Sequence, residues 1–274
     1  MADNRPIGYI DSGVGGLTVV KEALKQLPNE NILYVGDTAR CPYGPRPASQ
    51  VIEYTWQMTN YLVDKGIKML VIACNTATAV ALDEIKQALD IPVIGVIPPG
   101  TRAALNATST HRIGVIGTLG TIKSGSYERA LLEKSPETKV FSLACPKFVP
   151  IVESNEYHSS VAKKIVAETL AAFRGRKIDT LILGCTHYPL LRPIIQNVVG
   201  QDITLIDSGA SAITDVSALL DYFDSANTPE EGRTLTEFYT TGSPKMFREI
   251  TQEWLDLDEL SVQHIDLGGE EDAS

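Results

Sequence analysis

The sequence predicts two pseudo-symmetric parallel-sheet α/β domains with a candidate active site in the cleft between them. Short apolar runs alternate with longer amphipathic runs, a pattern typical of parallel strands connected by helices. The pattern begins again in the second part of the chain. The 274 residues are 43% hydrophobic and 21% charged, which is the composition of a globular protein and not of a disordered chain.

The first half alternates strands and helices up to the run Pro98-Pro99-Gly100, which is expected to break the chain. Each predicted helix carries apolar residues at the spacing of one helix face, and each predicted strand is a short apolar run. The predicted strands span residues 7–10, 31–35, 68–73 and 92–97, and the predicted helices span 17–27, 49–65 and 78–89.

Three segments of the second half resemble segments of the first half. The matched pairs are 5–12 with 112–118, 33–42 with 140–146, and 71–76 with 181–186. Their offsets along the chain lie between 104 and 111 residues. A predicted strand at 203–207 follows the last match, as the strand at 92–97 follows its counterpart. The sequence therefore predicts a duplicated α/β half.

The segment after the second half is too short for a good third domain and is expected to pack on the first half. It contains a predicted helix at 212–222, a strand at 237–239 and a last strand at 261–267. Another helix is expected to open at Ser243-Pro244, because serine is a preferred N-cap and proline suits the first helical position.

These elements predict a discontinuous first domain and a continuous second domain. The first domain comprises residues 1–98 and 209–267, and the second comprises residues 99–208. Residues 268–274 are predicted to form a frayed acidic tail.

The charge and the cysteines exclude several classes of protein. The 24 Lys and Arg residues and 34 Asp and Glu residues give a net charge of −10. This balance argues against nucleic acid or an anionic membrane as partner. No apolar run approaches the ~18 residues of a membrane span, and no export signal is seen. Four cysteines without a C-x-x-C motif favour a reducing cytoplasm over a disulfide scaffold or zinc site.

Polar and small residues follow the predicted strands of both halves. Ligands of open parallel sheets bind beyond the carboxyl ends of strands, where these residues fall. The Gly-rich turn at 11–16 would let backbone approach a ligand, or it is simply a tight turn. A dinucleotide fingerprint fails there, because Thr18 occupies its third glycine position. The residues at these ends include Asp11, Ser12, Asp37, Cys74, Asn75, Thr76, Thr118, Cys145, Cys185, Thr186 and His187.

Cys74 and Cys185 occupy equivalent positions of the repeat, which favours a functional pair over two inert apolar side chains. His187 lies close enough in sequence to assist deprotonation of Cys185, although an ordinary loop histidine fits equally well. Cys41 and Cys145 each precede proline, and a role in a turn suffices for them. On sequence alone, Glu153 reads as a solvated acid at a helix start.

Two thiols on opposing halves suit inversion of a carbon stereocentre. Such a reaction needs a base on one face of the carbon and an acid on the other, and a thiolate with a thiol supplies both. The α-hydrogen of an amino acid is a far weaker acid than a thiol, so carbanion charge must be stabilised by donors. Asn75, Thr76 and Thr186 are suitable donors. A Cys/His pair alone would instead suit a nucleophilic hydrolase.

Four motifs together resemble the glutamate racemase family over residues 5–267. They are Asp11-Ser12-Gly13-Val14-Gly15-Gly16-Leu17, Gly36-Asp37-Thr38 with Pro42-Tyr43-Gly44, Cys74-Asn75-Thr76-Ala77, and Gly184-Cys185-Thr186-His187-Tyr188-Pro189. The resemblance implies a homodimer that interconverts L- and D-glutamate without cofactor or metal and supplies D-glutamate for peptidoglycan.

The resemblance also implies roles for individual residues. Cys74 would take the α-proton from D-glutamate, and Cys185 would take it from L-glutamate. Asp11 and His187 would tune these thiols, with Glu153 as a further assistant. The residues implied to hold substrate are Asp11, Ser12, Pro42, Tyr43, Gly44, Asn75, Thr76, Thr118, Thr186 and His187.

Other functions remain open on sequence alone. Racemases of aspartate or hydantoins share the two-thiol arrangement, although the two cysteine motifs favour glutamate. A related decarboxylase would need only one thiol. A two-lobed binding protein for an acidic amino acid would need the pocket but no reactive thiol. A pyridoxal-phosphate enzyme is a further alternative.

Overall fold

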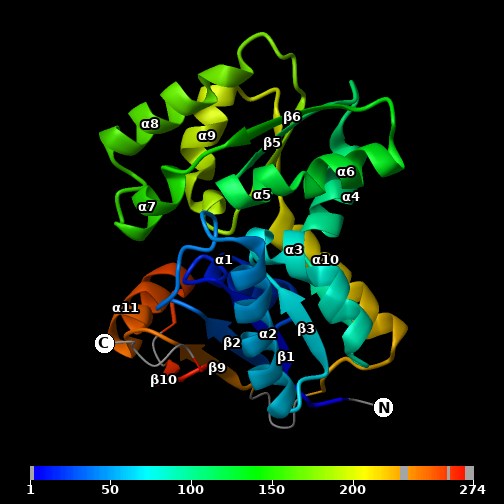
Figure 1. Ribbon diagram of the computed structural model, residues 1–274, viewed down its shortest axis with the longest axis vertical. Coiled ribbons are helices and arrows are strands. Elements are labelled where there is room, and N and C mark those ends of the chain that lie inside the picture. Colours follow the sequence, from blue (N-terminus) through cyan, green and yellow to red (C-terminus); the bar gives the residue numbers. More distant parts are fainter. Residues whose placement is uncertain (1–2, 229–233, 258–259, 269–274) are drawn as a thin grey trace.

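Two parallel sheets organise the chain, one in each lobe of the computed structural model (Figure 1). The structure describes residues 3–228, 234–257 and 260–268. The lower lobe in the figure holds a six-stranded sheet of order β10-β9-β2-β1-β3-β4, and the upper lobe holds a four-stranded sheet of order β6-β5-β7-β8. All strand pairings in both sheets are parallel.

The strands match the predicted apolar runs because helices cover the sheets and leave strands such as β1 wholly buried. In the six-stranded sheet they are β1 (Ile7–Asp11), β2 (Ile32–Gly36), β3 (Met69–Ile72), β4 (Val93–Gly95), β9 (Thr236–Thr240) and β10 (Ser261–His264). In the four-stranded sheet they are β5 (Arg112–Gly117), β6 (Lys139–Ala144), β7 (Thr180–Gly184) and β8 (Thr204–Asp207).

The helices connect successive strands and complete both lobes. They are α1 (Leu17–Gln26), α2 (Ala48–Asp64), α3 (Asn75–Ala88), α4 (Ile97–Ala107), α5 (Leu119–Ser124), α6 (Ser126–Lys134), α7 (Phe148–Glu153), α8 (Ser160–Leu170), α9 (Arg192–Val199), α10 (Ser208–Tyr222) and α11 (Pro244–Leu255). Two short 3₁₀ helices span Ala171–Phe173 and Tyr188–Leu191. No helix in the described part of the chain is both long and apolar enough to cross a membrane.

The two lobes share one connectivity, which confirms the predicted pseudo-symmetry. The order β2-β1-β3-β4 in one sheet corresponds to β6-β5-β7-β8 in the other. Cys74 follows β3, and Cys185 follows the equivalent strand β7. The two thiols therefore start from corresponding places in the two lobes.

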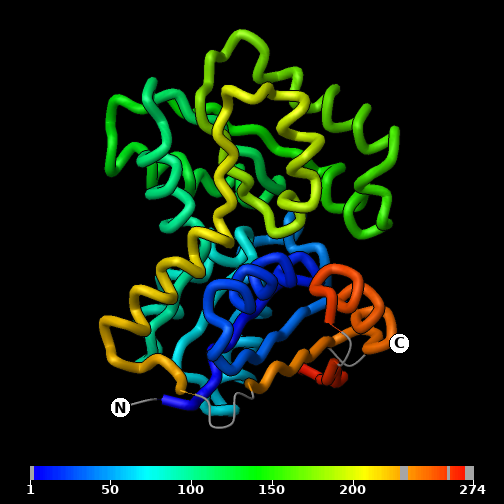
Figure 2. The backbone as a smooth tube through the Cα atoms, turned by 180° about the vertical axis from the view of Figure 1, so that it is seen from behind, coloured from blue at the N-terminus to red at the C-terminus, as the bar shows by residue number. Residues whose placement is uncertain are grey.

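The segment after α10 returns to the first lobe, as expected. Strand β9 pairs with β2, and β10 pairs with β9. Helix α11 begins at Pro244 with Ser243 as its N-cap, which confirms the predicted start. Figure 2 shows α10, in gold, running from the upper lobe down one side of the lower lobe. It packs against α1 of the lower lobe and against α4, which also packs on β7 and β8 of the upper lobe. The exact domain boundaries stay a prediction, and residues 269–274 of the predicted tail lie outside the described residues.

Three predicted boundaries are wrong for identifiable reasons. Pro98-Pro99-Gly100 does not break the chain, because the prolines occupy the first turn of α4, where proline needs no partner for its nitrogen. The strand predicted at 92–97 is shortened by the start of that helix and ends at Gly95. The strand predicted at 261–267 likewise ends at His264.

Two helices begin earlier than predicted because side chains at strand ends cap them. Helix α3 begins at Asn75, since the Cys74 sulfur accepts a hydrogen bond from the Ala77 N–H over 3.4 Å. Helix α10 begins at Ser208, since the Asp207 carboxylate accepts from the N–H groups of Gly209 and Ala210 in its first turn. Each capping residue directly precedes its helix at the carboxyl end of a strand. These helices therefore start at the edge of the sheet where ligands bind.

Helix α11 supports this edge through an aromatic cluster. Phe247 is 1% exposed and packs against Tyr34 of β2 and Phe238 of β9. The Tyr34 hydroxyl in turn donates to the Gly13 carbonyl over 2.7 Å. The returning C-terminal segment thus fixes the Gly-rich turn after β1.

We expect Phe247→Ala to lower the free energy of unfolding by about 3–5 kcal/mol, because it leaves a cavity in this cluster. Chemical denaturation measures the change. The adjacent Met246 is 63% exposed, so Met246→Ala is the matched control and should change stability little. Equal stability of the two variants would contradict the supporting role of Phe247.

Candidate active site

A small cavity between the lobes collects residues from the strand ends of both sheets. Its volume is about 20 Å³, which leaves room for about one water molecule. Every substrate-binding residue expected from the sequence lines it except Asp11, which is wholly buried beneath it. The lining consists of Ser12, Cys41, Pro42, Tyr43, Gly44, Cys74, Asn75, Thr76, Thr118, Val149, Cys185, Thr186 and His187.

The Gly-rich turn brings the two lobes together at this cavity. A Cβ added at Gly15 would lie 2.3 Å from Thr186 Oγ1 and 2.5 Å from His187 Nδ1. The Thr18 hydroxyl donates to the Thr186 carbonyl over 2.8 Å across the same contact. Glycine is needed here for close approach of the backbone. The sequence analysis expected a ligand as the neighbour, whereas at Gly15 the neighbour is the protein itself.

The Cys74 thiol lies in a buried environment that disfavours its ionisation. It is 5% exposed, and its sulfur lies 3.7 Å from Ser12 Oγ. Burial and the negative charge of nearby Asp11 raise the pKa of Cys74 to about 12, against the opposing hydrogen bonds from Ala77 N–H and Ser12. Cys74 is therefore held as the protonated thiol.

Asp11 is placed to contact both strand-end turns. Its carboxylate accepts from the Gly13 N–H over 3.0 Å and from the Thr186 hydroxyl over 3.4 Å. Burial raises the pKa of Asp11, while the charge of His187 and these hydrogen bonds oppose that rise. Asp11 therefore joins the β1 turn to the β7 turn, next to residues that line the cavity.

His187 and Glu153 form a chain of contacts that begins at the Cys185 sulfur. The Cys185 sulfur lies 3.7 Å from His187 Nδ1, and His187 Nε2 lies 3.0 Å from Glu153 Oε1. Burial alone would lower the pKa of His187, but the hydrogen bonds to Cys185 and Glu153 outweigh burial and raise it to about 10. The imidazolium therefore puts positive charge beside this sulfur, whereas Asp11 puts negative charge near Cys74.

Glu153 is not the free surface acid that sequence alone favoured. It lies at the end of α7 with its side chain 35% exposed. Burial raises the pKa of Glu153, but the hydrogen bond and charge of His187 dominate and lower it. The structure thus places Glu153 as a partner of His187.

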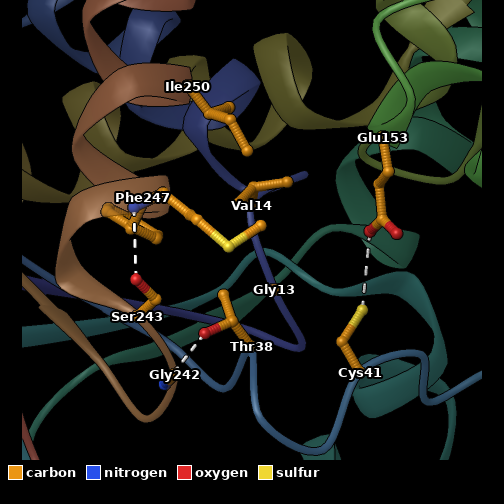
Figure 3. A pocket seen from close by; sticks show the side chains of 10 residues that line it. Gly13, Val14, Thr38, Cys41, Glu153, Gly242, Ser243, Phe247 and Ile250 are labelled. Atoms are coloured by element: carbon orange, nitrogen blue, oxygen red, sulfur yellow. Dashed lines mark hydrogen bonds between the residues drawn. The ribbon is translucent and has the colours of Figure 1, made fainter.

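Cys41 was missed by the sequence analysis as a member of this site. Its thiol donates to Glu153 Oε1 over 3.6 Å, and Figure 3 shows the two side chains pointing toward each other on one side of a larger pocket, with α11 on the other side. The following proline pointed only to a turn, and the proximity to Pro42-Tyr43-Gly44 was the available signal. Val149 was missed because nothing local marks a buried valine. Cys145 is buried and outside the cavity lining, in agreement with a structural role.

Polar side chains of the first lobe complete the cavity wall. Thr76 Oγ1 lies 2.9 Å from Thr118 Oγ1 of the second lobe. The Tyr43 hydroxyl donates to the Asp37 carboxylate, which Arg40 also contacts over 2.7 Å. Burial and the negative charge of Asp37 raise the pKa of Tyr43, so its phenol stays protonated.

In the part of the chain that the structure describes, no group of three or more His, Cys, Asp or Glu is placed to hold a metal ion.

The fold and the site define a class of enzyme. A protonated thiol and a thiol beside an imidazolium, carried by equivalent strands of two lobes, flank one polar cavity. The chain belongs to the Asp/Glu/Hydantoin racemase family, whose model matches residues 8–216. It is an isomerase of the amino-acid racemase class.

Individual relatives carry a more specific name. A glutamate racemase of Enterococcus faecalis is 68% identical over 271 residues, 99% of each chain. A solved glutamate racemase isoform of Bacillus anthracis is 43% identical with a TM-score of 0.93, covering 97% of this chain and 98% of its own. A glutamate racemase of Francisella tularensis, solved in complex with D-glutamate, is 36% identical with a TM-score of 0.90 and the same coverage.

The His187–Glu153 pair makes stability depend on pH in a defined way. Because the pKa of His187 is raised, its pairing contributes to the free energy of unfolding. This contribution is complete below the ordinary histidine pKa of 6.5 and is lost as the pH rises through about 10. Because the pKa of Glu153 is lowered, this carboxylate makes a second contribution to the free energy of unfolding. That contribution is complete above the ordinary pKa of 4.5 and is lost as the pH falls through the lowered pKa.

We therefore expect Glu153→Gln to reduce the free energy of unfolding most near pH 5–6, by roughly 1 kcal/mol after allowing for solvent screening. The difference from the unmodified protein should disappear above about pH 10. Denaturant titrations over this range measure it. Glu156→Gln, in the exposed turn after α7, is the matched control. A pH-independent difference for Glu153→Gln would show that the pair is not ionised as described.

Proposed function

We propose that this protein interconverts L- and D-glutamate without a cofactor, by proton transfer between two thiols, and supplies D-glutamate for peptidoglycan synthesis. The observation that carries the proposal is the placement of Cys74 and Cys185 at equivalent strand ends, both lining one cavity. The names of the relatives support glutamate as substrate. The reducing cytoplasm and a homodimer are part of the same proposal, and the free state of all four cysteines suits that compartment.

In the direction from L- to D-glutamate, the Cys185 thiolate removes the α-proton, and the Cys74 thiol delivers its proton to the opposite face. The Cys185 S–H bond forms as the α-C–H bond breaks, and the Cys74 S–H bond breaks as the new C–H bond forms. The imidazolium of His187 lies beside the Cys185 sulfur, and the raised pKa of Cys74 keeps its proton available. The reverse reaction exchanges the two roles.

The transient carbanion has to be stabilised, because an α-hydrogen is a much weaker acid than a thiol. Hydrogen-bond donors that are already in position before the reaction starts are the most effective source of such stabilisation. Ser12, Asn75 and Thr186 line the cavity with hydroxyl and amide groups. We assign these groups to the substrate carboxylate, next to the carbon that changes its configuration.

Incubation of the reduced, purified protein with L-glutamate in D₂O tests the function. We expect optical rotation to decay while deuterium enters the α-position, with no cofactor added. Aspartate and hydantoins serve as comparison substrates, and faster turnover of either would move the assignment to that substrate. Binding of glutamate with no α-exchange would support a binding protein instead.

The two thiols can be tested separately. Cys74→Ser and Cys185→Ser should each lower the racemization rate about a thousandfold, since one of the two proton-transfer groups is lost. Any residual α-exchange should be confined to one enantiomer. Cys145→Ala, outside the cavity, is the matched control and should retain the rate. Normal racemization by both serine variants would rule out the mechanism.

A further inference from the structure

Tyr127 on α6 is a buried residue of the second lobe that reaches the substrate-binding residues of the first. It is 2% exposed, and its hydroxyl donates to Asn75 Oδ1 over 2.7 Å. Its ring lies against the end of β7, where a Cβ added at Gly184 would be 3.0 Å from Tyr127 Cε2. Gly184 precedes Cys185, and Asn75 follows Cys74. One tyrosine therefore touches the sequence neighbours of both thiols.

The bond from Tyr127 decides which way the Asn75 amide faces. A side-chain amide has an accepting oxygen on one side and an NH₂ group with two donors on the other. Tyr127 occupies the oxygen, which leaves the NH₂ group for the cavity that Asn75 lines. A carboxylate only accepts hydrogen bonds, so it needs that NH₂ group. A flipped amide would present its oxygen to the carboxylate and repel it.

The surroundings of Tyr127 keep this arrangement fixed. Burial raises the pKa of Tyr127 far above its ordinary value, against an opposing hydrogen bond with Ser208, so the hydroxyl remains a donor. On its other side, a Cβ added at Gly100 would lie 3.4 Å from the Tyr127 hydroxyl oxygen. The ring is thus enclosed between the start of α4 and the end of β7.

We propose that Tyr127 is a positioning residue for the racemization, which holds the Asn75 amide with its NH₂ group toward the substrate carboxylate. The inference rests on the proposed function, since a carboxylate substrate gives the NH₂ group its role. The bond joins α6 of one lobe to α3 of the other. The donor is therefore aligned by a contact between the lobes.

Tyr127→Phe tests the proposal, because it removes the hydroxyl and keeps the ring. We expect KM for glutamate to rise about tenfold, with a smaller change in kcat, since a released amide binds the carboxylate less well. Tyr157→Phe is the matched control: its hydroxyl donates to Glu253 over 3.2 Å, away from the cavity. KM should be unchanged in the control, and thermal midpoints of both variants report on structure.

A double-mutant cycle separates positioning from general loosening of the structure. If Tyr127 acts through Asn75, Tyr127→Phe should raise KM in the unmodified protein but not in an Asn75→Ala background. An equal rise in both backgrounds, or no rise in either, would overturn the proposal.

Asn75→Asp provides a test that does not need a folded Tyr127 variant. It keeps an oxygen for the Tyr127 hydroxyl and replaces only the NH₂ group, so KM should rise at least as much as in Asn75→Ala. Unchanged KM would overturn the inference. Failure of the proposed function is distinct from all these outcomes, because the unmodified protein would then not racemize glutamate.

Discussion

The site depends on the contact between two strand-end turns that belong to different lobes. Parallel sheets place their strand ends along one edge, and here two such edges face each other. At Gly15 the separation leaves no room for a side chain, because Thr186 and His187 already fill that space. The backbone approach allows the Asp11 carboxylate of one lobe to accept from the Thr186 hydroxyl of the other. Without this contact, the two thiols would not line a common cavity.

The two lobes share a topology, but they surround their thiols with opposite charges. Cys74 lies near the buried carboxylate of Asp11, and Cys185 lies beside the imidazole of His187. If the surroundings of the two thiols were the same, neither sulfur would be favoured to carry the proton. The raised pKa of Cys74 keeps its proton in place, whereas the positive charge of His187 lies beside the Cys185 sulfur.

The sequence predicted the features that depend on local pattern. The strand β1, the start of α11 at Ser243-Pro244 and the equivalence of Cys74 and Cys185 all follow from periodicity, capping and repetition. The early start of α3 was missed because cysteine is not among the usual N-cap residues. Pro98-Pro99 was misread, because proline ends some helices and begins others.

Contacts made across the lobe boundary were beyond local pattern. The bond from Cys41 to Glu153 and the bond from Tyr127 to Asn75 join residues far apart in the chain. No sequence motif near any of these four residues predicts the contact with its partner. The role of Glu153 was available only through the resemblance to a family, and its contact with His187 emerges from packing of α7 against the β7 turn.

The N-cap position of Cys74 has a consequence for charge. Helix α3 is 14 residues long, and its aligned peptide dipoles place partial positive charge at the N-terminus, where the Cys74 sulfur accepts from a free N–H. When Cys74 gives up its proton in the proposed reaction, this helix end stabilises the thiolate that remains. Cys185 has an ionisable imidazole for the same purpose. One sulfur thus relies on a backbone dipole that no change of pH removes, and the other on a side chain that titrates.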